Sequence, residues 1–525
     1  MASSHHTCLV SLTLIQVQGT IDQLDQFKAG NKREFLRTSK AFLIRHCHET
    51  YTGRISPVCN HAGNCLRQYL SFFAASCMIA SVSGRVLLAS KIMRFCLAFL
   101  LMAVSAFASN HPQQITVNGK IYNWPKTPVV VVLIDGGDPA YLNAALERNL
   151  LPNFKKLMSE GFASVAQAVM PSFTNPNNVS VITGVLPASH GISGNFFLDP
   201  ATGEGVMMND PRFLRAESIL AKFSENGAKV VAIAAKDKLS KILAYKLRNG
   251  ISFSAEKADQ CTNKVNGIGN CLTYVGRPLP SEYSPELSLF VLEAGIKVLE
   301  REKPDLVYLS LSDYIQHKYA PGAKEANDFY IAIDTALGRL AALGATIAVT
   351  ADHGMNDKCG PDGSANIVFL QDILDREFGS KTTRVILPIT DPYVVHHAAL
   401  GSFASIYFVK PLPSIAVMKV LHRQPGVELV MNRASAAKTF ALPADRIGDL
   451  IVVGERSTVL GSSKATLDLS RLGGTRLRSH GGLADRNVYL MFSRPLNDAY
   501  AHIAISRVLR NFDAFDFALN GLQGR

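Results

Sequence analysis

The stretch PVVVVLIDGGD, residues 128–138, decides the fold. Its apolar, mostly β-branched run ends in an Asp/Gly turn, which is typical of a parallel strand buried on both faces of a sheet. Similar runs recur in three further segments: residues 229–234, 306–311 and 346–350. Helical patterns lie between the strands, at residues 153–161, 287–300 and 328–343. This alternation predicts an α/β domain in which helices flank a mostly parallel sheet.

The composition changes after residue 360 and predicts a second, smaller region. Residues 361–466 contain more turn-forming residues and the strand-like segment 402–409. We expect this region to be an inserted α+β cap. The main catalytic core then comprises residues 127–360 and 467–525.

The bulk composition is that of a globular protein, with 47% hydrophobic and 18% charged residues among 525. The formal net charge is +12, but residues 1–108 hold 11 Lys and Arg against 4 Asp and Glu, a net charge of +7. Only +5 remains for the rest of the chain, which has no basic stripe with interleaved aromatic residues. We therefore expect no nucleic-acid partner, and a small anionic substrate suits the mildly positive body.

Residues 93–108, MRFCLAFLLMAVSAFA, have the layout of a secretory signal with cleavage after Ala108. Because such a signal belongs at a chain start, we expect Met93 to be the true start and residues 1–92 to be a non-native or disordered extension. The alternative is a genuine extension followed by a signal-anchor helix. A start at Met93 predicts a periplasmic or secreted protein without stable membrane association after the signal is removed; otherwise the protein is expected in the cytoplasm.

Cys261 and Cys271 lie ten residues apart in the main body. In an oxidising compartment they can close a short loop by a disulfide. Two free thiols are the equally open alternative.

Polar residues recur where the predicted strands end, which is where open α/β sheets place their sites. The candidates follow the strands or precede the apolar segment VYLMF: Asp135, Asp313, His317, Asp352, His353 and His480. A spacing of four lets Asp313 and His317 share one face of a turn or short helix. An Asp after a strand is by itself most often a helix N-cap, and a lone His is usually an ordinary residue. Three Asp and three His together are a full ligand set for two zinc-like ions.

Thr174 precedes a helical pattern in MPSFTNPNNVSVITGVLPASHGISGN, residues 170–195. A helix N-terminus offers backbone N–H groups and a favourable dipole to an anion or an alkoxide. The alternative for Thr174 is a plain N-cap.

These motifs together resemble the alkaline phosphatase superfamily, in particular its nucleotide pyrophosphatase/phosphodiesterase branch. The resemblance covers about residues 128–492 and rests on LIDGGDPAYL, the segment 170–195, LSDYIQHKYAPG, TADHGMND and SHGG. It implies an alkaline phosphatase-like core and two Zn²⁺ ions. One ion would be held by Asp313, His317 and His480, and the other by Asp135, Asp352, His353 and the hydroxyl of the nucleophile Thr174. Asn195 would hydrogen-bond a phosphoryl oxygen.

Within that branch, IAAKDKLSKIL and ISFSAEKADQ are similar to members that cleave phosphonoacetate. The resemblance implies that Lys236 and Lys238 bind the substrate carboxylate; in an extended segment, side chains at i and i+2 also face the same way. A solvated lysine pair is the alternative. The expected reaction is hydrolysis of the C–P bond to acetate and phosphate through a phospho-threonine.

The competing functions are a nucleotide or alkyl phosphodiesterase with the same two-metal site and an inactive exported binding protein. A phosphodiesterase would want an aromatic slot, which Phe173 or Tyr314 could supply. The sequence leaves the oligomeric state open, with a homodimer as one candidate.

Overall fold

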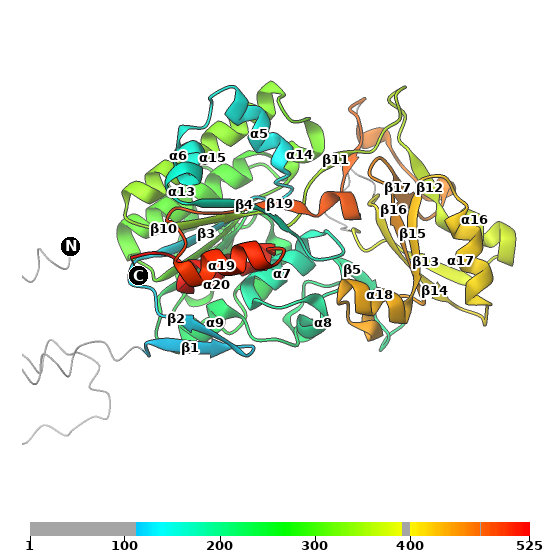
Figure 1. Cartoon of the computed structure of the whole chain (residues 1–525), viewed down its shortest axis with the longest axis horizontal. Helices are drawn as coiled ribbons and strands as arrows, with labels where there is room; N and C mark the ends of the chain where they lie inside the picture. Colours follow the sequence, from blue (N-terminus) through cyan, green and yellow to red (C-terminus); the bar gives the residue numbers. More distant parts are fainter. Residues whose placement is uncertain (1–111, 391–398, 473, 525) are drawn as a thin grey trace, which may run out of the picture. The chain divides into compact units, whose positions relative to one another are not determined.

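The strand predicted at residues 128–134 is β3, Val129–Leu133, and all five of its residues are buried. The computed structural model describes residues 112–390, 399–472 and 474–524. Within these, β3 is the middle strand of a seven-stranded sheet with the order β4-β19-β10-β3-β9-β7-β8 (Figure 1). The other strands are β4 (Phe162–Gln167), β7 (Val230–Ala234), β8 (Ile251–Ser254), β9 (Leu306–Ser310), β10 (Thr346–Thr350) and β19 (Asn487–Phe492).

The sheet is mostly parallel, as predicted. β10, β3, β9, β7 and β8 run in one direction, while β19 pairs antiparallel with both β10 and β4. β8 was not predicted, because serines interrupt the apolar run in its sequence, ISFS. The orientation of β19 was also not predicted.

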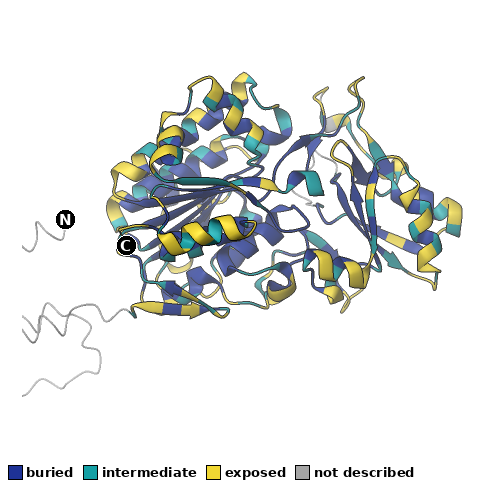
Figure 2. Ribbon diagram, viewed as in Figure 1, coloured by how far each residue is buried: buried dark blue, intermediate teal, exposed yellow. Residues whose placement is uncertain are grey.

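Two helical layers cover the sheet because its side chains alternate between two faces. Val130 and Val132 of β3 face one hydrophobic core, and Val129, Val131 and Leu133 face the other. The first core packs against α5 (Pro139–Glu147), α6 (Pro152–Glu160), α13 (Glu286–Glu302) and α15 (Lys324–Ala342). The second packs against α7 (Thr174–Thr183), α9 (Ile219–Glu225) and α20 (Ala514–Asn520). In Figure 2 the strands of the central sheet are coloured mostly as buried, whereas the helices that flank it carry exposed residues. The α/β architecture is thus confirmed.

A smaller antiparallel sheet, with the order β13-β14-β16-β15, lies within residues 361–466. Its strands are β13 (Thr383–Ile386), β14 (Phe403–Phe408), β15 (Val427–Asn432) and β16 (Leu450–Gly454). Helices α16 (Leu370–Phe378) and α17 (Ser414–His422) pack on one face. On the other face Phe403, Ile451 and Val453 share a core with Met170 and Phe173, so this sheet packs against the segment that leads to Thr174.

The predicted signal at residues 93–108 and the extension at residues 1–92 lie outside the described residues. Among the residues that are described, no helix is long and apolar enough to cross a bilayer. A disulfide joins Cys261 to Cys271, which selects the first of the two alternatives for this pair.

Candidate active site

Four predicted ligands lie at the carboxyl ends of three neighbouring strands. Asp135 follows β3, Asp313 follows β9, and Asp352 and His353 follow β10. Because these strands are adjacent and parallel, their carboxyl ends bring the side chains together at one edge of the sheet. None of the four is more than 3% exposed. Charged groups are buried this deeply when they are paired or bind a metal.

The spacing of four between Asp313 and His317 has the predicted consequence. Asp313 is the N-cap residue of α14 (Tyr314–Lys318), and His317 lies one turn along it. His317 Nε2 is 3.1 Å from Asp313 Oδ2. The carboxylate and the imidazole therefore face the same point.

The three predicted histidine ligands are oriented in the same way. Nδ1 donates to a backbone carbonyl oxygen at 2.7 Å in His317, 2.9 Å in His353 and 2.8 Å in His480. Because a carbonyl oxygen only accepts, the Nδ1 atoms carry protons, and in its neutral form each ring presents the lone pair of Nε2. This is the usual arrangement of a metal-binding histidine.

Asp135 and His353 offer the clearest place for a metal ion. His353 Nε2 lies 3.2 Å from Asp135 Oδ1, and neither buried atom has a hydrogen-bond partner among the described residues. Asp352 Oδ2 is 3.7 Å from the same nitrogen, while its Oδ1 accepts hydrogen bonds from the backbone N–H groups of Gly136 and His353. Oxygen and nitrogen donors grouped in this way fit Zn²⁺ or a similar ion.

The loop after β18 (Arg478–Ser479) brings His480 onto His353. The two imidazoles stack with ring centroids 3.5 Å apart and planes 8° from parallel. Gly481 makes the turn possible: its φ is +117°, and a Cβ there would lie 2.3 Å from the ring of Phe173. Only glycine fits between His480 and this aromatic side chain.

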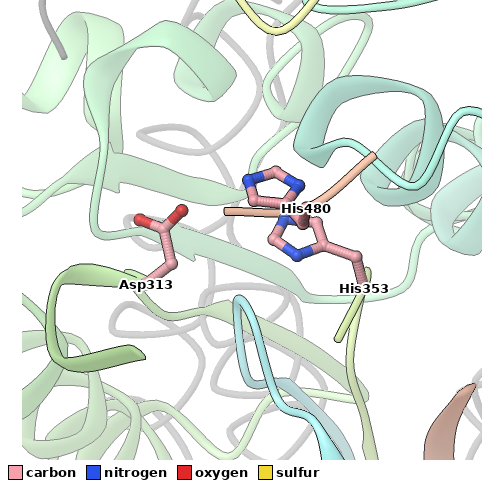
Figure 3. A group of neighbouring side chains, drawn as sticks. All are labelled: Asp313, His353 and His480. Atoms are coloured by element: carbon pink, nitrogen blue, oxygen red, sulfur yellow. The ribbon is translucent and has the colours of Figure 1, made fainter. Parts of the chain in front are cut away.

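Two overlapping groups of potential ligand atoms result, each spanning at most 4.8 Å: Asp313, His353 and His480; and Asp135, Asp352 and His353. Figure 3 shows the Asp313 carboxylate facing the two stacked imidazoles. His317 was predicted to bind the same ion as Asp313 and His480; in the structure it contacts Asp313, while the stacking of His353 on His480 adds His353 to this group. All six ligands lie together, and their division between two ions stays a prediction.

The electrostatics keep several groups in states that can bind a cation. Burial opposes ionisation of Asp313, but Lys236 and His317 outweigh it and hold its pKa well below the usual range. Burial and the charges of His353 and His317 lower the pKa of His480 well below its usual value. His353 differs: burial disfavours its charge, yet Asp352 and Asp135 raise its pKa to about 9, so an ion that binds Nε2 must displace a proton from it. An ionised Asp313 and a neutral His480 are the forms that ligate metals.

Thr174 is the first residue of α7 and is only 2% exposed. The N-cap residue is Phe173, whose side chain cannot cap, so the plain N-cap alternative for Thr174 is wrong. Two residues earlier, the carbonyl oxygen of Ser172 accepts the hydrogen bond from His480. This hydrogen bond connects the segment before α7 to the loop that carries His480.

Asn178, which was not predicted from the sequence, links α7 to the predicted ligand Asp352. Its Nδ2 donates to Asp352 Oδ2 at 3.3 Å and to the Thr174 carbonyl oxygen at 3.0 Å. Its Oδ1 accepts from the hydroxyls of Tyr308 and Ser310. The available signal was its position four residues after Thr174, on the same helical face.

Asn195 lies beside the N-terminus of α7. Its Oδ1 accepts a hydrogen bond from the backbone N–H of Asn175 at 2.9 Å, and it is 3% exposed. Because the carbonyl end of the amide is engaged there, its other end is the donor Nδ2. That polarity suits the predicted contact with a phosphoryl oxygen, which stays a prediction.

Lys236 lies among the proposed ligands. Its Nζ is 2.5 Å from Asp313 Oδ1 and 3.1 Å from Asp135 Oδ2, and the residue is 4% exposed. The ammonium thus bonds one carboxylate from each predicted metal site. The remaining oxygens, Asp313 Oδ2 and Asp135 Oδ1, face the imidazoles of His317 and His353.

The expected extended segment at Lys236 and Lys238 is wrong. Asp237–Leu239 is a turn of 3₁₀ helix, in which side chains two positions apart do not point the same way. The backbone N–H of Asp237 donates to Glu256 Oε2 at 2.6 Å, and its carbonyl oxygen accepts from Ser240 Oγ at 2.7 Å. These contacts stabilise the turn. Lys238 is nevertheless buried, at 8% exposure, and is not a solvated surface lysine.

The two aromatic residues that were predicted as possible contacts for a nucleobase, Phe173 and Tyr314, differ in burial and in contacts. Phe173 is fully buried and packs edge-on against His480, so it cannot take a nucleobase. Tyr314 is partly exposed and contacts Tyr283 edge-on, with ring centroids 5.5 Å apart. The Tyr283 ring lies 5.8 Å from Lys236 Nζ. Tyr283 and Tyr314 are therefore the aromatic pair beside the ligand cluster.

Comparisons with known proteins agree with this geometry. Residues 129–481 match the type I phosphodiesterase / nucleotide pyrophosphatase family. Phosphonoacetate hydrolase from Sinorhizobium meliloti 1021, solved with phosphonoformate, is 47% identical, with a TM-score of 0.74; the match covers 77% of this chain and 98% of that chain. Mouse ectonucleotide pyrophosphatase/phosphodiesterase 5 is 18% identical over 75% of this chain and 96% of its own, with a TM-score of 0.51, which shows a shared fold.

An uncharacterized pyrophosphatase/phosphodiesterase from Schizosaccharomyces pombe is 34% identical over 86 residues, 16% of this chain and 17% of that protein. The chain therefore spans under a fifth of the length of this curated relative. The family match, in contrast, extends from β3 to the loop that carries His480. The chain belongs to the type I phosphodiesterase and nucleotide pyrophosphatase family of hydrolases, and its core has the alkaline phosphatase-like fold of that family.

Proposed function

We propose that the protein hydrolyses the C–P bond of phosphonoacetate to acetate and phosphate, with two zinc ions and a phospho-threonine intermediate. The observation that carries the proposal is the 47% identity to a phosphonoacetate hydrolase over 98% of that chain. Another structure of the S. meliloti protein was solved with phosphonoacetate itself. The buried Asp and His cluster supports a metal-dependent reaction at the same edge of the sheet.

The leaving group sets the chemical problem. Breaking the C–P bond leaves its electron pair on carbon, and the resulting carbanion is tolerable only when that charge spreads into the adjacent carboxylate. When bound, divalent ions supply positive charge that lowers the pKa of an attacking hydroxyl and polarises phosphoryl oxygens. The protein must then orient the nucleophile and place positive charge at the carboxylate end.

Thr174 is the proposed nucleophile. Its hydroxyl loses its proton as the oxygen forms the new bond to phosphorus and the C–P bond breaks, and the carbon takes up a proton to give acetate. Asn195 Nδ2 donates to a phosphoryl oxygen as charge develops there. Water then hydrolyses the phospho-threonine, which releases phosphate and restores the hydroxyl.

Lys236 and Lys238 supply positive charge at the carboxylate end. Lys236 has a second task in this proposal, because its bonds to Asp135 and Asp313 fix two proposed metal ligands. Lys238 is buried on the same 3₁₀ turn and is the second proposed contact for the substrate carboxylate.

A nucleotide or alkyl phosphodiesterase is the competing proposal. The Tyr283 and Tyr314 pair beside Lys236 favours it, since paired aromatic rings suit a flat leaving group. The buried Lys236 and Lys238 favour phosphonoacetate, because a nucleobase does not require two cations.

A direct assay separates the proposals. Purified protein would be incubated with phosphonoacetate, a nitrophenyl phosphodiester or ATP, with zinc or after chelation, and Thr174→Ala is the control. We expect phosphate release from phosphonoacetate only with metal present. Acid-quenched reactions should show one added phosphate on the peptide that contains Thr174. A preference of more than tenfold in kcat/KM for the diester or for ATP would refute the substrate assignment, and an unmodified peptide during rapid turnover would refute the intermediate.

A further inference from the structure

A fully buried ion pair lies beside the ligand cluster and contains none of the residues discussed so far. Lys358 Nζ is 3.4 Å from Asp485 Oδ1 and 3.3 Å from Asp485 Oδ2, and both residues are 0% exposed. Lys358 Nζ also donates to the carbonyl oxygen of Arg456 at 2.9 Å. Withdrawing two charges from water is costly, and apolar residues of similar volume often stabilise a fold as well or better. Fold stability alone therefore does not account for this pair.

The hydrogen bonds of Asp485 join the two loops that carry His353 and His480. Its Oδ2 accepts from the backbone N–H of Gly482 at 2.9 Å, two residues after His480. Its Oδ1 accepts from Asn356 Nδ2 at 2.6 Å, three residues after His353. Its carbonyl oxygen accepts from the backbone N–H of Gly354 at 2.7 Å, directly after His353.

The segment that precedes Thr174 contacts Gly482 as well. Ser172 Oγ donates to the carbonyl oxygen of Gly482 at 2.8 Å, and Ser172 lies two residues before Thr174. The carboxylate of Asp485 thus fixes Gly482, and Gly482 in turn holds the turn before α7. Three separate loops are thus connected through Asp485 and Gly482.

We propose that Asp485, held by Lys358, is a positioning residue that sets the distance between His353 and His480 and hence the metal affinity of the site. The inference rests on the proposed zinc-dependent function. Partners of this kind orient the ligands without touching the ion, and their replacement typically weakens metal binding.

The test compares two variants with a structural control. Asp485→Asn keeps one acceptor oxygen but leaves Lys358 without a carboxylate, whereas Asn356→Ala removes one loop contact and keeps the ion pair. The control is Asp334→Asn, because Asp334 is equally buried and holds the start of α6 through Asn153 Nδ2 and the Phe154 N–H. Zinc content and zinc affinity would be measured by chelator competition on folded protein, with kcat and KM for phosphonoacetate measured alongside.

We expect zinc affinity to fall by about 10- to 100-fold in both variants, and kcat to fall when zinc is limiting. Asp334→Asn should lower the melting temperature and leave zinc affinity unchanged. If Asp485→Asn does not fold, Asn356→Ala carries the test. Unchanged zinc affinity in the folded variants, or an equal loss in Asp334→Asn, would overturn the inference alone. A wild-type chain that binds no zinc would overturn the proposed function, and the inference with it.

Discussion

The substitution Lys236→Met tests the proposed double role of this lysine. Its ammonium makes two charge-assisted hydrogen bonds, to Asp313 at 2.5 Å and to Asp135 at 3.1 Å. One such bond contributes about 1.5–3 kcal/mol, and losing that much in the transition state lowers kcat/KM by about 10- to 150-fold. Because both aspartates are proposed metal ligands for any substrate, we expect this loss with a nitrophenyl phosphodiester as well as with phosphonoacetate. The loss should be larger with phosphonoacetate, whose carboxylate also loses a cation.

The matched variants are Lys238→Met and Lys241→Met. Lys238→Met should impair phosphonoacetate cleavage and spare the diester, whose leaving group is already stable. Lys241 is exposed on α10 (Ser240–Leu243), and its replacement should change neither rate. The assays are phosphate release and nitrophenol release at saturating zinc. If Lys236→Met leaves the diester rate within about twofold of the wild type, the bonds to Asp135 and Asp313 do not support catalysis, and the double role is refuted.

Three further predictions concern the nucleophile and the stability of the fold. Thr174→Ala should reduce turnover of both substrates to background while zinc content, measured by metal analysis, stays at the wild-type value; residual phosphate release above background would contradict nucleophilic attack by this hydroxyl. Burial lowers the pKa of His190 to about 3; the unfolded chain therefore binds a proton below pH 6.5 that the folded protein does not, and stability falls as the pH drops. In urea titrations, the free energy of unfolding of His190→Gln should fall by about 2 kcal/mol less between pH 7.5 and 5 than that of the wild type. Parallel curves of unfolding free energy against pH would count against this assignment. Reduction of the Cys261–Cys271 disulfide, whose cysteines are 10 residues apart, should cost about 3 kcal/mol of unfolding free energy in the same titration, whereas an unchanged midpoint would show that loop closure contributes nothing.

Much of the fold was predictable because a strand that is buried on both faces has a continuous apolar run in its sequence. The runs at β3, β9 and β10 are almost purely apolar, and the Asp or His that follows each of them lies where parallel strands end. β8 was missed because ISFS contains alternating serines, which remain buried at an edge of the sheet. The pattern of apolar residues along a strand predicts which of its faces are buried, but it does not predict which strand lies next to it in the sheet.

The rest of the site depends on contacts that are distant in the sequence. Asn178 meets Asp352 across 174 positions, and Asp485 meets Asn356 across 129. Neither pair has a local spacing that could reveal it. The turn at Lys236 is likewise set by Glu256, which accepts a hydrogen bond from the residue after Lys236. Local pattern alone therefore predicted an extended segment where a tertiary contact produces a 3₁₀ turn.

Charge balance connects the ligand set to the choice of substrate. Asp135, Asp313 and Asp352 are buried together with Lys236, whose ammonium contacts the first two; these four groups sum to −2 when all are ionised. Such an excess is expensive to bury, and the two divalent ions of the proposed function would convert it to +2. Lys238 is buried on the same turn as Lys236 and is the next cation along the chain. Fully ionised phosphonoacetate carries three negative charges and offsets this +2, whereas a phosphodiester carries one and leaves it positive. The same metal ligands can therefore serve either chemistry, and the lysine beyond them is the group whose removal should shift the preference from the trianion towards the monoanion.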